Sequence, residues 1–159
     1  MLARAQTGEE DVRRAPVELC PLLVEIAEVL ATSAEVAVDC PDGLVVYADR
    51  DLVEQVFSNL ASNAAAHTQR GRITITARAL DAERVAIELV DTGAGIASES
   101  QGRIFDRFYR GETAESSGFG LGLAIVRQAV RVLDGTVEIE STAGVGTRVS
   151  VTLPLARPA

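Results

Sequence analysis

The stretch from Asp51 to Thr68 constrains the fold most, because it reads as one long amphipathic helix. Its apolar residues recur at helical spacing and form one broad arc: Leu52, Val53, Val56, Phe57, Leu60 and Ala64. Asn59 and Asn63 lie four residues apart at the border of this arc, so their side chains stack on one side of the helix. A carboxamide oxygen is a good neutral ligand for Mg²⁺. Asparagines at such a border more often only hydrogen-bond to a neighbouring loop.

The bulk composition indicates one soluble globular domain. The chain has 159 residues, of which 47% are hydrophobic and 24% charged. Aromatic residues make up only 4% and tryptophan is absent, so the core must be aliphatic. The net charge of −8 argues against a nucleic-acid partner and against an anionic membrane surface. An anionic ligand would need local devices such as helix ends, backbone N–H groups, a metal or a few arginines.

The two cysteines, Cys20 and Cys40, form no CxxC pattern and have no nearby histidine. We expect them to be small core residues with free thiols in a reducing compartment, and we expect no zinc site. The sequence shows no secretory signal and no apolar run that approaches a membrane span. A soluble part of a membrane-anchored protein would look the same.

Periodicity predicts an α/β domain with helices on one face of a mixed sheet. Helical spacing predicts helices over residues 20–34, 51–68 and 120–133, with a short one near 98–109. The third of these should stop at Asp134 and Gly135, with the glycine in the C′ position. Alternation predicts strands over 35–40 and 44–48 as a hairpin, 73–79 and 85–91 as two long strands, and 136–140 and 148–153 as a final hairpin. Residues 16–19 form a short extended piece.

Two glycine motifs and the segment between them suggest a binding site. In Asp91-Thr92-Gly93-Ala94-Gly95-Ile96 a strand ends on a carboxylate, which could accept from a ligand amino group, and the glycines let the chain pass close to a flat ring. Gly118-Phe119-Gly120-Leu121-Gly122-Leu123 leads into a helix, so its free N–H groups form an anion site suited to phosphate. In the segment 103–110, Phe105 and Phe108 would anchor the chain, and Arg107 or Arg110 could reach a phosphate.

The order of these parts resembles the catalytic, ATP-binding domain of bacterial two-component sensor histidine kinases. The Asn-bearing helix, DTGAGI, IFDRFYR, GFGLGLAIV and GVGTRVSVTLP match the N, G1, F, G2 and G3 boxes of that family, which is related to gyrase, Hsp90 and MutL. The resemblance implies an α+β fold of the Bergerat type: a two-layer α/β sandwich whose mixed, mostly antiparallel sheet is covered on one face by about three helices. Residues 16–159 would form this domain, and residues 1–15 would be the end of an upstream dimerisation and phosphoacceptor helix with its linker.

The resemblance also implies roles for individual residues. Asn63 would be the Mg²⁺ ligand, Asp91 would accept the adenine amino group, and Thr147 would help to close the adenine site through water. Asn59 would lie near the phosphates and Arg110 would approach the γ-phosphate, which makes these two the expected catalytic residues. The whole expected ATP-binding set is Asn59, Asn63, His67, Asp91, Gly93, Gly95, Ile96, Arg107, Arg110, Gly118, Gly120, Leu121, Gly122, Leu123 and Thr147.

The expected reaction is transfer of the γ-phosphate of Mg·ATP to a histidine on a separate dimerisation domain of the same kinase, and from there to a response regulator. Related ATPases carry a glutamate base where this chain has Asn59, and a carboxamide takes no proton at neutral pH, so transfer is favoured over hydrolysis. The only histidine, His67, lies in the nucleotide helix, so we expect no autophosphorylation of the chain alone. The isolated domain should be a monomer, and its parent a homodimer with this portion in the cytoplasm.

Two residues depart from the family pattern. Ala66 replaces a basic residue that meets phosphate, and Phe119 replaces a small hydroxyl residue. Arg70, Arg107 or Arg110 would supply the missing charge, and the acidic segment 111–117 should be a mobile lid. Two alternatives remain: an ATPase or serine kinase of the same superfamily, and a degenerate domain that binds a partner without turnover.

Overall fold

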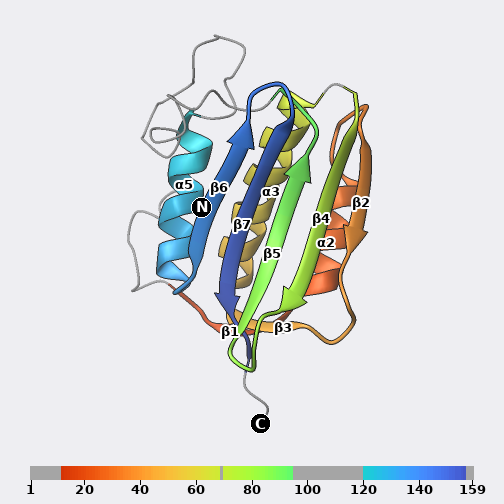
Figure 1. The fold of residues 1–159 in the computed structure, drawn as a ribbon. Coiled ribbons are helices and arrows are strands. Elements are labelled where there is room, and N and C mark those ends of the chain that lie inside the picture. Colours follow the sequence, from red (N-terminus) through yellow and green to blue (C-terminus); the bar gives the residue numbers. More distant parts are fainter. Residues whose placement is uncertain (1–11, 69, 95–119, 157–159) are drawn as a thin grey trace.

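The computed structural model describes residues 12–68, 70–94 and 120–156 and shows a two-layer α/β sandwich. Its five-stranded sheet has the order β2-β4-β5-β7-β6, and the described helices α2, α3 and α5 all cover the same face (Figure 1). The elements in chain order are β1 (Ala15–Glu18), α2 (Leu19–Glu28), β2 (Glu35–Asp39), β3 (Val45–Ala48), α3 (Arg50–His67), β4 (Arg72–Ala79), β5 (Arg84–Asp91), α5 (Gly120–Val132), β6 (Thr136–Thr142) and β7 (Gly146–Pro154). The predicted fold class is confirmed.

The sheet buries one face because its strands alternate at period two. β4, β5, β7 and β6 pair antiparallel in that order, and only β2 joins its neighbour β4 in parallel. Across the central strands Ile75 lies opposite Leu89, and Leu89 lies opposite Val149, so one apolar row runs through the core. The alternate residues are more polar and face away from the helices.

Helix α3 is the central helix of the second layer. Asp49 caps its N-terminus, since its Oδ1 accepts from the backbone N–H of Asp51 at 3.0 Å and from that of Leu52 at 3.4 Å. The apolar arc predicted from the sequence faces the sheet and α5, and Phe57 in its middle is fully buried. The helix therefore contributes core packing along its length and reaches the far end of the sheet with its last turns.

The prediction of a hairpin from residues 35–40 and 44–48 is wrong. β2 pairs in parallel with β4, with Glu35 opposite Arg72, whereas β3 pairs antiparallel with β1 in a separate two-stranded sheet. Both segments alternate as strands do, but alternation alone does not identify a partner. Val46 and Ala48 are fully buried in β3, where they lie opposite Val17 and Ala15 of β1.

Two helix ends also differ from the sequence prediction. α2 ends at Glu28, before the predicted end at residue 34, and Val29 is 80% exposed. Farther along, Ala34 N–H donates to Thr32 Oγ1 at 3.0 Å in a local turn, so these residues do not continue the helix. After α5 the residue in the left-handed conformation is Asp134, with φ of 62°, and not Gly135. Gly135 is needed for a different reason: a Cβ at this position would overlap the carbonyl oxygen of Thr152.

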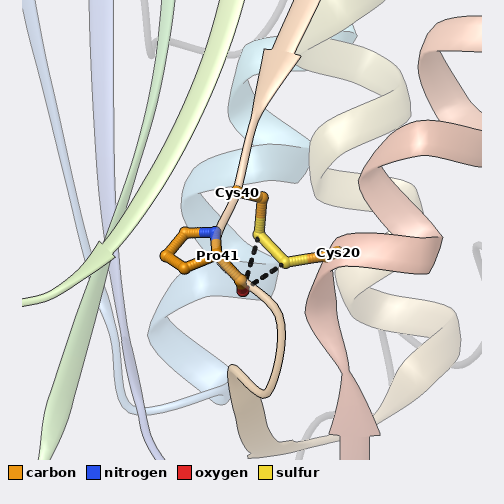
Figure 2. The surroundings of a disulfide bond; sticks show 3 residues. All are labelled: Cys20, Cys40 and Pro41. Carbon is orange, nitrogen blue, oxygen red and sulfur yellow. Dashed lines mark hydrogen bonds between the residues drawn. A yellow bond between two sulfur atoms is a disulfide. The ribbon is translucent and has the colours of Figure 1, made fainter.

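Cys20 and Cys40 form a disulfide, so the expectation of free thiols is wrong (Figure 2). Cys20 lies in the first turn of α2, Cys40 follows β2, and their Cα atoms are 5.7 Å apart. The sequence could not show this proximity, because it depends on β2 joining β4 at the edge of the sheet. The carbonyl oxygen of Pro41 lies 3.0 Å from Sγ of Cys20, where it would accept a hydrogen bond from the reduced thiol.

Reduction of this disulfide should lower the free energy of unfolding. The bond closes a loop with a sequence separation of 20. Closing a loop of this size removes chain entropy from the unfolded state worth about 3 kcal/mol, part of which the thiol hydrogen bond to Pro41 offsets. Urea denaturation with and without dithiothreitol measures the difference, and a Cys20→Ser/Cys40→Ser double variant serves as the control that reductant should not affect. A urea midpoint of the wild-type protein that is the same with and without dithiothreitol would contradict the prediction.

Candidate functional site

A pocket lies at the end of the sandwich where the last turns of α3 meet β5, β6, β7 and α5. Its lining is mainly aliphatic, with one carboxylate, one carboxamide, one imidazole and one hydroxyl: Leu60, Asn63, Ala64, His67, Leu89, Asp91, Leu123, Ile139, Thr147 and Val149. The structure thus brings together five residues that the sequence singled out, Asn63, His67, Asp91, Leu123 and Thr147.

Asp91 is the last residue of β5 and is only 9% exposed. Its backbone is fixed between Ile73 of β4 and Thr147 of β7, because β5 is a central strand. The carboxylate Oδ1 accepts from the backbone N–H of Gly93 at 2.9 Å. Burial raises the pKa of Asp91 above its ordinary value, and the Gly93 N–H and the nearby His67 offset part of this rise. A hydrogen-bond acceptor is therefore held rigidly against the apolar lining.

Two glycines allow the backbone to close around Asp91. A Cβ on Gly93 would overlap the carbonyl oxygen of His67, so this glycine lets the chain after β5 pass against the end of α3. A Cβ on Gly146, whose φ is 149°, would overlap the carbonyl oxygen of Asp91. The sequence prediction assigned Gly93 to the border of a flat ring and did not include Gly146. The only sign of Gly146 in the sequence was its place in the GVGT segment.

Asn63 and His67 lie one turn apart near the C-terminal end of α3. Asn63 is 8% exposed, and its Nδ2 atom is buried without a hydrogen-bond partner in the part of the chain that the structure describes. Burial lowers the pKa of His67, although the Asp91 carboxylate acts in the opposite direction. Burial thus favours the neutral imidazole over the charged one. A buried donor without a protein acceptor marks the place where a ligand would complete the hydrogen bonding.

Asn59 is not part of the pocket lining. It lies one turn before Asn63, is half-buried, and donates from Nδ2 to the carbonyl oxygen of Gln55 at 2.9 Å. Thr147 does reach the pocket, and its hydroxyl is 2.8 Å from the hydroxyl of Ser141, which donates to the carbonyl oxygen of Gly146 at 3.0 Å. The β6–β7 hairpin thereby holds the Thr147 side chain in place.

Several expected site residues lie outside the described residues: Gly95, Ile96, Arg107, Arg110 and Gly118. The short helix expected near residues 98–109 and Phe119 also lie there. The first residues of α5 are Gly120, Leu121 and Gly122, of which the structure describes the helical backbone alone. Among the described positions, Ala66 and Arg70 are both exposed.

The sequence prediction also missed the aliphatic lining, namely Leu60, Ala64, Leu89, Ile139 and Val149. Helical spacing and strand alternation marked most of these as core residues, and nothing in the pattern distinguishes a core contact from a pocket wall. Among the described residues no group of three His, Cys, Asp or Glu side chains gathers as a metal site would. Within the same part of the chain, no helix is long and apolar enough to cross a membrane.

Comparisons with known proteins identify the family. Residues 48–157 match the model of the histidine kinase-, DNA gyrase B- and HSP90-like ATPases. The sensor-like histidine kinase SenX3 of Mycobacterium tuberculosis is 35% identical over 161 residues, which cover 96% of this chain and 39% of SenX3. The chain thus spans well under half of this relative.

Solved structures agree with this assignment. Full-length ShkA in complex with AMPPNP has a TM-score of 0.84 and 30% identity, covering 99% of this chain and 34% of ShkA. The mycobacterial sensor histidine kinase MprB has a TM-score of 0.78 and 25% identity, covering 91% of this chain and all of that one. The chain therefore belongs to the histidine kinase-, DNA gyrase B- and HSP90-like ATPase family, and its relatives there are sensor histidine kinases.

Proposed function

We propose that this chain binds Mg·ATP in the pocket and donates the γ-phosphate to a histidine on a separate dimerisation domain of the same sensor kinase. The observation that carries the proposal is the buried Asp91 carboxylate, held at the inner wall of an aliphatic pocket between α3 and the sheet. Membership of the family supports it, as does the AMPPNP complex of the similar protein ShkA.

The adenine ring would occupy the aliphatic part of the pocket. A flat heterocycle fits between Leu60 and Ala64 on α3 and the side chains of Leu89 and Val149 on the sheet. Asp91 accepts a hydrogen bond from the exocyclic amino group, a donor that guanine does not present at this position. Because the carboxylate is buried, a ligand without this donor would leave it poorly solvated, which gives selectivity for adenine.

The phosphates would extend from the adenine toward the start of α5 and the asparagines of α3. The helix start at Gly120 presents backbone N–H groups and the positive end of a helix dipole. Asn63 fits a cation site, because a turn of its carboxamide exchanges the partnerless Nδ2 for the oxygen. Mg²⁺ bound there would neutralise charge on the phosphate oxygens. Asn59, Arg107 and Arg110 are further proposed phosphate contacts.

The residues present favour transfer over hydrolysis. Asn59 offers no base for water, and the titratable groups in the described pocket, Asp91 and His67, lie at its adenine end. His67 is also the only histidine of the chain, and its place in the pocket makes it a poor phosphate acceptor. The acceptor would thus come from the dimerisation domain of a homodimeric parent, with a response regulator downstream and this portion of the kinase in the cytoplasm.

A degenerate, partner-binding domain is the second candidate. Ala66 favours it, since this exposed position carries no cation to meet a triphosphate.

Residues 1–15 remain the proposed link to the upstream phosphoacceptor helix, and residues 16–159 the proposed catalytic domain.

Phosphotransfer with labelled ATP tests the proposed function. The chain alone should bind Mg·ATP without becoming labelled, and addition of the parent kinase's upstream phosphoacceptor segment should produce an acid-labile phosphate on that segment. Absence of ATP binding at millimolar concentration would favour the degenerate domain. Release of phosphate by the chain alone, or label on serine, would favour the ATPase or the serine kinase.

Adenosine affinity should fall as the pH falls below neutral. The pKa of Asp91 is raised by burial, so its carboxylate takes up a proton at a higher pH than an exposed aspartate does, and the protonated form no longer accepts from the amino group. Calorimetric titration from pH 7.5 to 5 measures the effect, and adenosine avoids titration of the phosphates. An Asp91→Asn variant should bind adenosine weakly at every pH. A His67→Gln variant should keep the pH dependence of wild type, because Asp91 and not His67 causes it. Equal slopes in wild type and Asp91→Asn would remove Asp91 from the adenine site.

Asn63→Ala should abolish the Mg²⁺ dependence of ATP binding while adenosine affinity changes little. The variant removes the one partnerless buried amide of the described pocket and leaves Asp91 and the aliphatic lining in place. ATP titrations in the presence of Mg²⁺ and in the presence of EDTA give two affinities. Their ratio is compared between the variant and wild type. Ser62→Ala, at the exposed neighbouring position, is the matched control and should behave as wild type. A variant that still needs Mg²⁺ would contradict the ligand role.

A further inference from the structure

The residues just before β1 contact the far ends of both helices that frame the pocket. Val12 packs against the hydrophobic core, Arg13 contacts the start of α3, and Arg14 contacts the end of α5. β1 and the C-terminal end of α5 lie at one end of the sandwich, opposite the end where β5 finishes at Asp91 (Figure 1). Neither arginine was singled out by the sequence, and the proposed function gives them no role.

The contact with α3 is made through its N-cap. Asp49 is 2% exposed and uses both carboxylate oxygens: Oδ1 caps α3, and Oδ2 accepts from the backbone N–H of Arg13 at 2.9 Å. The entering chain is therefore tied to the cap of the helix that carries Asn63 and His67. Since the backbone N–H makes this bond, a side-chain substitution at Arg13 would keep it.

The contact with α5 depends on one side chain. Arg14 Nη2 donates to the carbonyl oxygen of Val132, the last residue of α5, at 2.6 Å, and lies 3.3 Å from Oδ2 of Asp134. The final carbonyls of a helix have no intrahelical partner and carry the negative end of the dipole, so a guanidinium there is favourable. The Arg14 side chain is 29% exposed, so solvent screens this contact less than it would a free surface pair.

The two anchored helices are the ones whose opposite ends face the proposed phosphates. α5 starts at Gly120 and is 13 residues long, which corresponds to roughly 20 Å of helix. α3 and α5 pack against each other, and both line the pocket, through Asn63 on α3 and Leu123 on α5. α5 packs on α3, so loss of the contact at its C-terminal end would let it tilt about that packing, and such a tilt moves its N-terminal end as well.

We propose that Arg14 is a positioning residue: its guanidinium holds the C-terminal end of α5 and thereby sets where the N-terminal end of α5 meets the triphosphate. Arg13 and Arg14 are consecutive, so the short stretch just before β1 contacts both the cap of α3 and the end of α5. This inference rests on the proposed function. It assigns Arg14 a larger effect on triphosphate binding than on adenosine binding, because the adenine would be held mainly by side chains of α3, β5 and β7, with Leu123 as the contribution of α5.

Affinities of the chain for Mg·ATP and for adenosine test this proposal. Arg14→Met keeps most of the aliphatic stem and removes the guanidinium, and it should weaken Mg·ATP binding by about fivefold, in the range of modest long-range couplings. Adenosine binding should stay within about twofold, which also shows that the variant is folded. Arg14→Lys keeps the charge at the helix end and should restore most of the lost Mg·ATP affinity.

Two further variants complete the design. Arg131→Met removes an exposed cation from the last turn of α5 and should leave both affinities as in wild type. Asp134→Asn removes the negative charge from the second partner of Arg14, at a left-handed position that asparagine tolerates, and should weaken Mg·ATP binding less than Arg14→Met does.

The outcomes separate the inference from the function on which it rests. Three results would overturn the positioning role: Arg14→Met weakens the binding of both ligands equally, it changes neither affinity, or Arg131→Met loses as much Mg·ATP affinity. In each case ATP binding by the wild-type chain still upholds the proposed function. A wild-type chain that binds no ATP overturns both.

Discussion

The burial of one carboxylate is the constraint on which the pocket depends. An aspartate inside an aliphatic lining is costly unless its orientation is fixed and hydrogen bonds reach it. Here the central position of β5 fixes the backbone of Asp91, and the N–H of Gly93 supplies a donor at 2.9 Å. Gly93 and Gly146 leave room for the backbone around Asp91, because a Cβ on Gly93 would overlap the carbonyl oxygen of His67 and a Cβ on Gly146 that of Asp91.

The same helix serves the core and the pocket. With no tryptophan and few aromatic residues in the chain, the core of the described part is built from aliphatic side chains around the buried Phe57 of α3. Farther along the helix, the arc that packs on the sheet continues into Leu60 and Ala64, which line the pocket. A continuous apolar surface therefore passes from the filled interior to the pocket in which we propose that adenine binds.

The sequence predicted the helices and strands well, but it did not predict which distant segments contact one another. The helix around Asn63, the strands that end at Asp91 and the final hairpin all follow from local periodicity, and the structure confirms them. The partner of β2, and with it the Cys20–Cys40 bond, depends on contacts distant in sequence that no local pattern encodes. For the same reason Arg14, an ordinary charged residue in the sequence, gave no sign of its contact with Val132.

The disulfide also affects how easily one margin of the domain opens locally, compared with the pocket. The chain between Cys20 and Cys40 comprises most of α2 and all of the edge strand β2, whereas the described pocket residues begin at Leu60. The crosslink therefore opposes local opening of one margin of the sandwich. Such an opening would expose the backbone amides of α2 and β2 to hydrogen exchange while the pocket end stays closed. The margin and the pocket can in this way differ in stability within a single fold.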